Sequence, residues 1–96
     1  MPKGYWIVHL KVTDPDTYRR YADVAPAIVT QLGGTYTVDA GRSEIAEGDA
    51  SLDRHVVVEF PSFEAARSAF HSDAYQSVVH HRHESADCFF TFAEGA

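Results

Sequence analysis

One short stretch, residues 54–66, constrains the fold of this chain most, because a strand pattern gives way to a helix start within a few residues. The three consecutive valines at 56–58 are β-branched, which suits a pleated strand and disfavours a helix. Pro61 has no N–H group to donate, so strand pairing should end there. Ser62 follows it and can cap a helix that begins at Phe63. The stretch therefore predicts a buried strand joined by a tight turn to a helix.

Alternation along two segments indicates that each strand has one apolar face and one mixed face. In residues 55–60 the apolar face holds Val56, Val58 and Phe60, and the mixed face holds His55, Val57 and Glu59. In residues 5–12 the corresponding sets are Trp6, Val8, Leu10 and Val12 on one face and Tyr5, Ile7, His9 and Lys11 on the other. We expect the even-numbered positions to face the helices.

The segment after the first strand has the features of a long helix. Asp14 can cap its start, and Pro15 suits the first helical position. Core-facing side chains then recur at three- and four-residue steps, at Tyr18, Tyr21, Ala25, Ile28 and Leu32. Pro26 lies inside this pattern and should kink the helix or split it near Val24. The paired glycines at 33–34 should end it.

The remaining segments follow in chain order: a strand at 35–39, a short extension outside the main sheet at 43–47, a surface loop at 48–53, a helix from 63 to about 71, a second helix from about 74 to 83, and a last strand at 86–93. The series strand, helix, strand, strand, helix, strand predicts an α+β fold with a four-stranded antiparallel sheet in the order 4-1-3-2 and helices on one face. Its length suits a single domain over residues 1–96.

The odd-numbered face of this sheet would remain uncovered in a monomer. It carries Ile7, Val57 and Phe89 among polar groups. Because exposed apolar patches of this kind usually mark interfaces, we expect a homodimer formed through the sheet face.

Charge and cysteine content narrow the classes of partner. The formal net charge is −6 without a basic stripe, so nucleic acid and anionic membrane are not expected partners. Cys88 is the single cysteine, which excludes an intrachain disulfide, and its apolar strand context favours a buried, inert thiol. The apolar run at residues 5–10 is too short for a signal peptide or a membrane span, so we expect a cytoplasmic protein.

Several short motifs together resemble a known family, the domain of unknown function 1330, within the dimeric α+β barrel superfamily. They are Gly4-Tyr5-Trp6-Ile7, Asp14-Pro15 followed by Tyr18 and Tyr21, Gly33-Gly34, the turn at Gly48, the stretch from Arg54 to Phe63, Tyr75-Gln76, Arg82 and Glu94-Gly95. The resemblance covers essentially the whole chain and implies a ferredoxin-like βαββαβ protomer whose sheet packs against a second protomer. It implies no established activity. Relatives in the superfamily include cofactor-independent monooxygenases, haem-degrading enzymes and lactone isomerases, which is an analogy of fold alone.

Four side chains on the predicted inner helical stripes are candidates for ligand binding: Tyr18, Tyr21, Tyr75 and Arg82. In this superfamily the pocket, where there is one, lies between helices and sheet. Tyrosine hydroxyls and a guanidinium there could orient a small oxygenated or anionic molecule. The alternative interpretation makes the tyrosines core residues and pairs Arg82 with an acid such as Glu59 or Asp87.

His9 and Glu59 are the candidates for catalysis or for a structural pair. Both lie at odd positions, and with the first and third strands treated as parallel neighbours they could meet, across the dimer or within it. His9 would then either transfer protons or form an interface hydrogen bond that fixes register. The register is open at this stage, and a shift of two residues would replace Glu59 by His55 or Arg82.

The histidines at His80, His81 and His83, beside Glu84, could in principle supply two metal ligands on one helical face. The favoured interpretation is a solvated helix end whose imidazoles meet the negative end of the helix dipole, so neither a metal nor another cofactor is expected.

Three functions are compatible with these features. The first is a homodimeric protein that binds a small ligand between helices and sheet. The second is a cofactor-independent enzyme, of monooxygenase or lactone-isomerase type, in which His9 or a pocket tyrosine moves a proton. The third is a purely structural association module.

Overall fold

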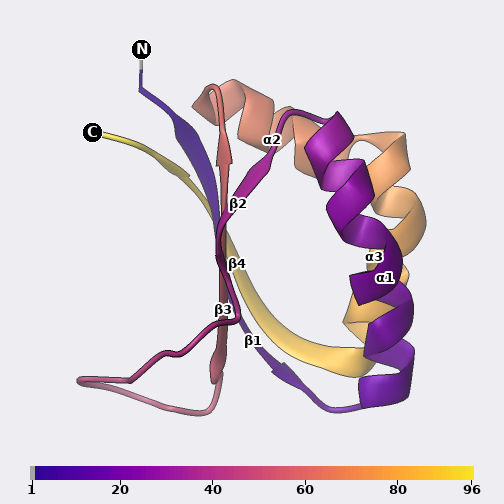
Figure 1. Ribbon diagram of the computed structural model, residues 1–96, viewed down its shortest axis with the longest axis vertical. Helices are drawn as coiled ribbons and strands as arrows, with labels where there is room; N and C mark the ends of the chain where they lie inside the picture. Colours follow the sequence, from indigo (N-terminus) through magenta and orange to yellow (C-terminus); the bar gives the residue numbers. More distant parts are fainter. Residues whose placement is uncertain (1) are drawn as a thin grey trace.

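A computed structural model describes residues 2–96 and contains four strands and three helices. In chain order they are β1 (Gly4–Val12), α1 (Pro15–Gln31), β2 (Thr35–Asp39), β3 (Arg54–Phe60), α2 (Phe63–His71), α3 (Asp73–Ser85) and β4 (Ala86–Glu94). All three helices lie on one side of the sheet (Figure 1). This is the predicted ferredoxin-like α+β arrangement, with two consecutive helices in the second helical position.

The sheet is antiparallel throughout, in the order β2-β3-β1-β4, which confirms the predicted order. β1 and β3 are central neighbours that run in opposite directions, with Tyr5 opposite Glu59 and His9 opposite His55. The parallel orientation assumed for a His9–Glu59 pair is therefore wrong. It is wrong because β3 returns through a hairpin from β2, which runs in the same direction as β1 after the α1 crossover.

Each of the three helix starts is capped, and the caps at Asp14 and Ser62 are the ones that the sequence predicts. The Asp14 carboxylate accepts a hydrogen bond from the Thr17 N–H at 3.3 Å, and the Ser62 hydroxyl accepts one from the Ala65 N–H at 3.0 Å. The Ser72 hydroxyl caps α3 in the same way. Such caps typically contribute about 1 kcal/mol each.

Two expectations need revision. Pro26 was expected either to kink α1 or to split it in two. α1 continues as one helix through Pro26, so the split does not occur. Residues 43–47 do not form a strand. They belong instead to the long β2–β3 connection, which projects from the sheet on the side away from the helices (Figure 1). Since residues 41–51 are all exposed and no strand lies beside them, no ladder forms there.

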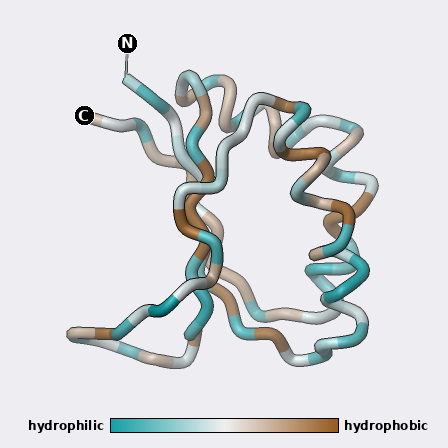
Figure 2. The backbone as a smooth tube through the Cα atoms, in the orientation of Figure 1, coloured by the Kyte–Doolittle hydropathy of each residue, from teal (hydrophilic) through white to brown (hydrophobic). Residues whose placement is uncertain are grey.

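The core is centred on Trp6 and lies between the even-numbered sheet face and the helices. Trp6 is 2% exposed, and its ring centroid lies 4.9 Å from those of both Phe60 and Tyr75. Its indole N–H donates to the Ala66 carbonyl at 2.7 Å, so its one polar group is satisfied. Hydrophobic positions recur along the strands of the sheet and along the helices that lie beside it (Figure 2). The predicted assignment of even positions to the helices is confirmed.

The odd-numbered face is not covered by any helix of the protomer (Figure 1). Phe89, at its edge, is 61% exposed. The neighbouring positions Ile7 and Val57 are only partly buried, by their own sheet. Among residues 2–96, none of the helices has the length and apolar character needed to cross a bilayer.

Candidate functional site

A cavity of about 270 Å³ lies between α1 and the helix-facing side of the sheet. Its walls combine apolar side chains with three tyrosines and charged groups at the rim, including Val8, Leu10, Phe90, Tyr18, Tyr21, Tyr36, Asp39 and Arg54. The tyrosines come from α1 and β2, and the apolar residues come from the central strands and β4. A mostly apolar hollow with a few convergent polar groups is the usual form of a small-molecule site.

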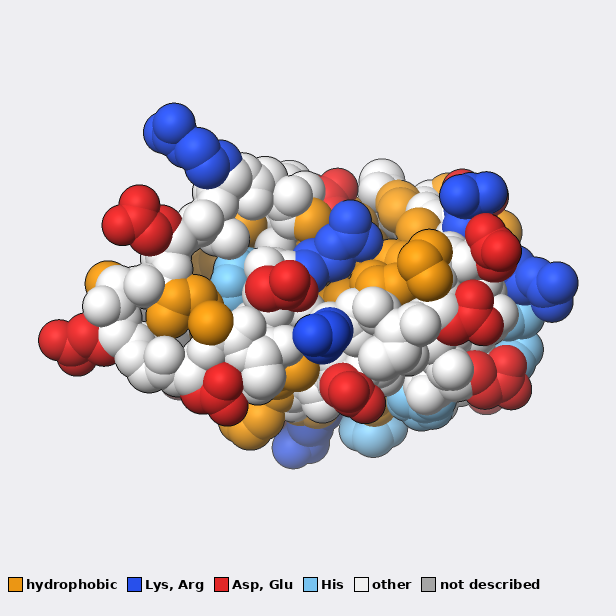
Figure 3. Space-filling model, turned by 90° about the horizontal axis from the view of Figure 1, so that it is seen from below, with side chains coloured by type: hydrophobic (Ala, Val, Ile, Leu, Met, Phe, Trp, Pro, Cys, Tyr) orange, Lys and Arg blue, Asp and Glu red, His pale blue; other side chains and the backbone are white. Residues whose placement is uncertain are grey.

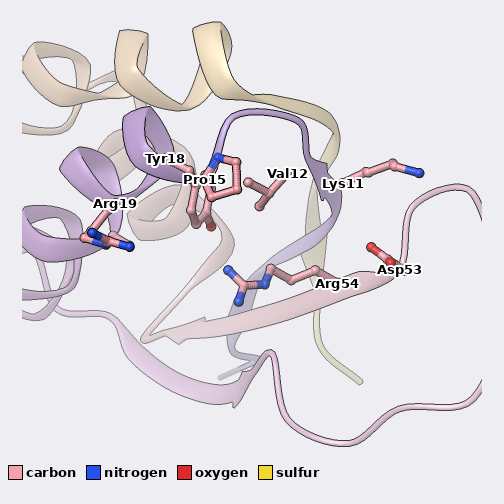
Figure 4. A pocket seen from close by; sticks show the side chains of 8 residues that line it. Lys11, Val12, Pro15, Tyr18, Arg19, Asp53 and Arg54 are labelled. Atoms are coloured by element: carbon pink, nitrogen blue, oxygen red, sulfur yellow. The ribbon is translucent and has the colours of Figure 1, made fainter.

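The cavity adjoins a wider outer bay of about 480 Å³, and Tyr18, Ala22 and Arg54 line both. The Arg54 guanidinium points into the bay and lies 5.4 Å from the centre of the Tyr18 ring (Figure 4). Arg19 approaches from α1, whereas the Lys11 side chain points away (Figure 4). Two arginines therefore flank the entrance.

The charge at the entrance is not cancelled by ion pairing. Among the described residues the ion pair within 4.0 Å is Arg67–Glu64, on the exposed side of α2, and Arg54 forms none. Asp53 lines the outer bay and Asp39 the inner cavity. Seen from below, apolar side chains lie exposed beside charged groups of both signs (Figure 3). The entrance can therefore admit a molecule with an apolar body and a negative group.

A chain of buried hydroxyls lies at the inner end of the cavity. The hydroxyl oxygens of Tyr21 and Tyr75 are 2.5 Å apart, and Tyr75 is completely buried. Burial raises the pKa of Tyr21, Tyr75 and Tyr36 above the ordinary tyrosine value, because it disfavours the charged phenolate. All three phenols are neutral at physiological pH and can donate hydrogen bonds.

Arg82 is buried directly behind these tyrosines, with 3% of its surface exposed. The guanidinium carbon lies 5.0 Å from the Phe90 ring centre and 5.6 Å from that of Tyr21. The Arg82 Nε atom has no hydrogen-bond partner. The expected pairing of Arg82 with Glu59 or Asp87 is wrong, because the guanidinium packs into the aromatic layer instead of reaching a carboxylate.

The structure separates His9 from Glu59. The Nδ1 atoms of His9 and His55 are 2.8 Å apart, while Glu59 accepts a hydrogen bond from the Tyr5 hydroxyl at 3.1 Å. The His9–Glu59 pair is thus wrong, and the alternative in which His55 takes the place of Glu59 is the observed one. The antiparallel register causes both outcomes. Since His9 projects from the odd face, it cannot reach a ligand in the helix–sheet cavity of its own protomer.

The three histidines of α3 do not assemble with other ligands. His80 and His81 stack with ring centroids 4.0 Å apart near the end of the helix. Burial lowers the pKa of His83, and the positive charges of Arg82 and His80 lower it further. Within residues 2–96 no group of three or more His, Cys, Asp or Glu side chains is placed to hold a metal ion.

The cavity residues that were not anticipated from the sequence include Tyr36, Arg54 and Ala40. Tyr36 could have been found, because it is an even position of a predicted strand. Arg54 is the first residue of β3, and whether its side chain lines a cavity depends on where α1 lies, which the sequence does not reveal. Ala40 adopts a left-handed conformation with φ of 55°, which costs an L-residue about 1–2 kcal/mol. The sequence does not indicate this conformation, because the adjacent Gly41 is the residue expected to adopt it.

Comparison with known families identifies the family of this chain. The model of the family described as Domain of unknown function (DUF1330) matches residues 3–96. This chain belongs to the DUF1330 family. No curated protein matches it.

Solved structures similar to this DUF1330 chain share its fold at low sequence identity. A protein of unknown function from Rhodopseudomonas palustris has a TM-score of 0.79 and 15% identity, over 99% of this chain and 83% of that one. SnoaB, a cofactor-independent oxygenase from Streptomyces nogalater, has a TM-score of 0.65 and 10% identity, over 97% and 92% of the two chains. A dimeric ferredoxin-like protein of unknown function from Thermobifida fusca has a TM-score of 0.57 and 10% identity, over 96% and 90%. At such identities the likeness establishes the fold alone.

Proposed function

We propose that this protein binds a small aromatic molecule with a negative group in the cavity between α1 and the sheet. The observation that carries the proposal is that Arg54 lines both the 270 Å³ cavity and the adjoining outer bay. A ring would lie against Val8, Leu10 and Phe90, removed from water. A negative group at the entrance would meet a guanidinium that has no carboxylate partner.

The size of the cavity limits the ligand. Sites for drug-sized molecules are typically about 300–1,000 Å³, so the inner cavity suits a single substituted ring and the bay suits its extension. The neutral phenols of Tyr21 and Tyr36, which line the cavity, supply hydrogen-bond donors without adding charge. The site thus supports recognition of a ring that carries oxygen substituents.

The same proposal includes a homodimer through the odd-numbered sheet face. A patch containing Ile7, Val57 and the 61% exposed Phe89 lies open in the protomer. A second copy would remove this apolar surface from water. The relative from Thermobifida fusca is described as dimeric, which supports the same assembly here. The ligand cavity lies on the other side of the sheet, so it would stay accessible in such a dimer.

Ligand-induced changes in melting temperature test the binding proposal. Benzoate, salicylate and 4-nitrophenol should stabilise the protein, since a ligand at 100 times its Kd adds about 2.7 kcal/mol by mass action. Ala22 lies between bay and cavity, so Ala22→Trp should abolish the effect. Ala27→Trp is the matched control, because Ala27 is an exposed position of the same helix outside both cavities. A flat response of the wild type, or equal responses of both variants, would contradict the proposal.

A further inference from the structure

Arg82 is a buried cation that no described carboxylate neutralises, and it stands behind the wall of the ligand cavity. We infer that the ligand carries an oxyanion, a phenolate or a carboxylate, at its inner end, where the Tyr21 hydroxyl donates to it and Arg82 compensates its charge. This inference rests on the proposed function and adds a second position for a negative group, at the inner end of the cavity and distinct from the entrance position beside Arg54. It makes Arg82 a positioning residue, which acts through the tyrosines.

The inner wall of the cavity, formed by Tyr21 and Phe90 with Arg82 behind them, carries a positive charge. A guanidinium keeps its charge in proteins, and an unpaired buried charge is strongly unfavourable. The groups around Arg82 are the Tyr21 and Tyr75 phenols, the Cys88 thiol and the Phe90 ring. Burial raises the pKa of Tyr21, Tyr75 and Cys88, so each is neutral at physiological pH. The inner wall therefore carries one uncompensated positive charge.

This positive charge lies close to the cavity. Tyr21 and Phe90 line the cavity, and the Arg82 guanidinium carbon lies 5.6 Å and 5.0 Å from their respective ring centres. Only one layer of aromatic side chains separates the charge from the ligand. In a water-poor site a negative group there is stabilised more strongly than in solvent.

The hydrogen bond between Tyr21 and Tyr75 has a direction that a bound ligand can select. The hydroxyl oxygens of Tyr21 and Tyr75 are 2.5 Å apart, and either hydroxyl can be the donor of this hydrogen bond. A negative ligand group that accepts the Tyr21 proton leaves the Tyr21 oxygen to accept from the Tyr75 hydroxyl, so such a ligand selects the direction from Tyr75 to Tyr21. The chain thus offers the cavity a donor and favours a ligand that accepts.

The protonation state of a bound chromophore tests this inference. 4-Nitrophenol has different absorption bands as phenol and as phenolate, and 4-nitroanisole is its uncharged counterpart. We expect the protein to bind the phenolate about tenfold more tightly than the phenol, which lowers the apparent pKa of bound nitrophenol by about one unit. Tyr21→Phe should remove most of this preference and weaken nitroanisole binding much less than nitrophenolate binding. Tyr18→Phe is the matched control on the same cavity wall and should keep the preference.

Competition between bound nitrophenol and a second ligand shows whether the site prefers a negative group, and its outcomes distinguish this inference from the proposed function. Benzoate should displace nitrophenol better than the neutral isostere benzamide does. A phenolate preference that survives Tyr21→Phe would overturn the inner oxyanion and leave the proposed site, with its negative group at Arg54, intact. Equal affinity for nitrophenolate and nitroanisole, or equal displacement by benzoate and benzamide, would overturn the negative group of both proposals. Binding of none of these probes would overturn both. Arg82→Met should reduce the preference as Tyr21→Phe does; if that variant fails to fold, the result for Tyr21→Phe decides.

Discussion

The two faces of the one sheet differ although the same strands build them. On the even face Trp6, Val58 and Phe60 are at most 2% exposed, whereas on the odd face Phe89 is 61% exposed. The helices cover the first face and leave the second free (Figure 1). Alternate residues of one strand thus serve different purposes: the even-numbered ones stabilise the protomer, and the odd-numbered ones remain available to contact a second protomer.

The polar groups of the two faces also differ in how they are satisfied. On the odd face they pair across neighbouring strands, as His9 with His55 and Tyr5 with Glu59. On the even face the inner end of the cavity retains a guanidinium without a counterion. A face whose polar groups are already paired suits docking of a second protein surface, and a pocket with an unmatched charge suits a small charged ligand.

The largest effect should come from deleting a buried ring on the even face. Phe60→Ala should cost about 3–5 kcal/mol of unfolding free energy, through lost burial and the cavity left beside Trp6. Phe89→Ala, the same substitution on the odd face, should change the stability of the isolated protomer by no more than about 0.5 kcal/mol. Urea denaturation at high and low protein concentration measures both. If Phe60→Ala costs less than about 1 kcal/mol, the two faces do not differ in the way described.

The second effect concerns assembly. The wild type should sediment as a dimer of 10.6 kDa chains. Phe89→Asp should raise the dissociation constant of the dimer by more than about tenfold, because it places a negative charge in the interface close to the same charge of the second protomer. Val24→Asp, at a 42% exposed position of α1, is the control and should leave the dimer unchanged. Sedimentation equilibrium distinguishes the cases. A wild type that is monomeric at micromolar concentration would exclude association through this face.

A smaller effect is expected at the His9–His55 pair. One Nδ1 must donate and the other accept, so the two rings should hold different tautomers, which ¹⁵N NMR resolves. His55→Asn should change the His9 ring signals, and Glu59→Gln should leave them as they are. A response of His9 to Glu59→Gln would instead support the pairing that the antiparallel register excludes.

The smallest effect is expected at Tyr5. The Glu59 carboxylate accepts the Tyr5 hydrogen bond and thereby raises the pKa of Tyr5, since it favours the neutral phenol. Glu59→Gln should lower this pKa toward the ordinary value, as ultraviolet titration can show. Because the folded pKa is the higher one, this contact stabilises the fold below about pH 10 and loses its effect as pH rises above that value. An unchanged Tyr5 titration would mean that the contact does not persist in solution.

Much of the fold follows from local chemistry that a sequence displays directly. Pro61 ends a strand, Ser62 and Asp14 cap helices, and alternation assigns Trp6 and Phe60 to the core face. Each of these depends on a residue and its near neighbours along the chain. Helical periodicity likewise places Tyr18, Tyr21, Tyr75 and Arg82 on inner faces, and the structure locates all four at or behind one cavity wall. Their role in ligand binding stays a prediction.

Only the tertiary structure decides which of these groups meet. His9 faces His55 instead of Glu59 because strand direction and register depend on the hairpin and the crossover, which alternation does not encode. Arg82 has no acid partner because α3 packs it against Phe90, and Arg54 reaches the bay because α1 crosses above the start of β3. Alternation and periodicity repeat within one element, whereas a pocket and its charge depend on distances between elements that no local pattern contains.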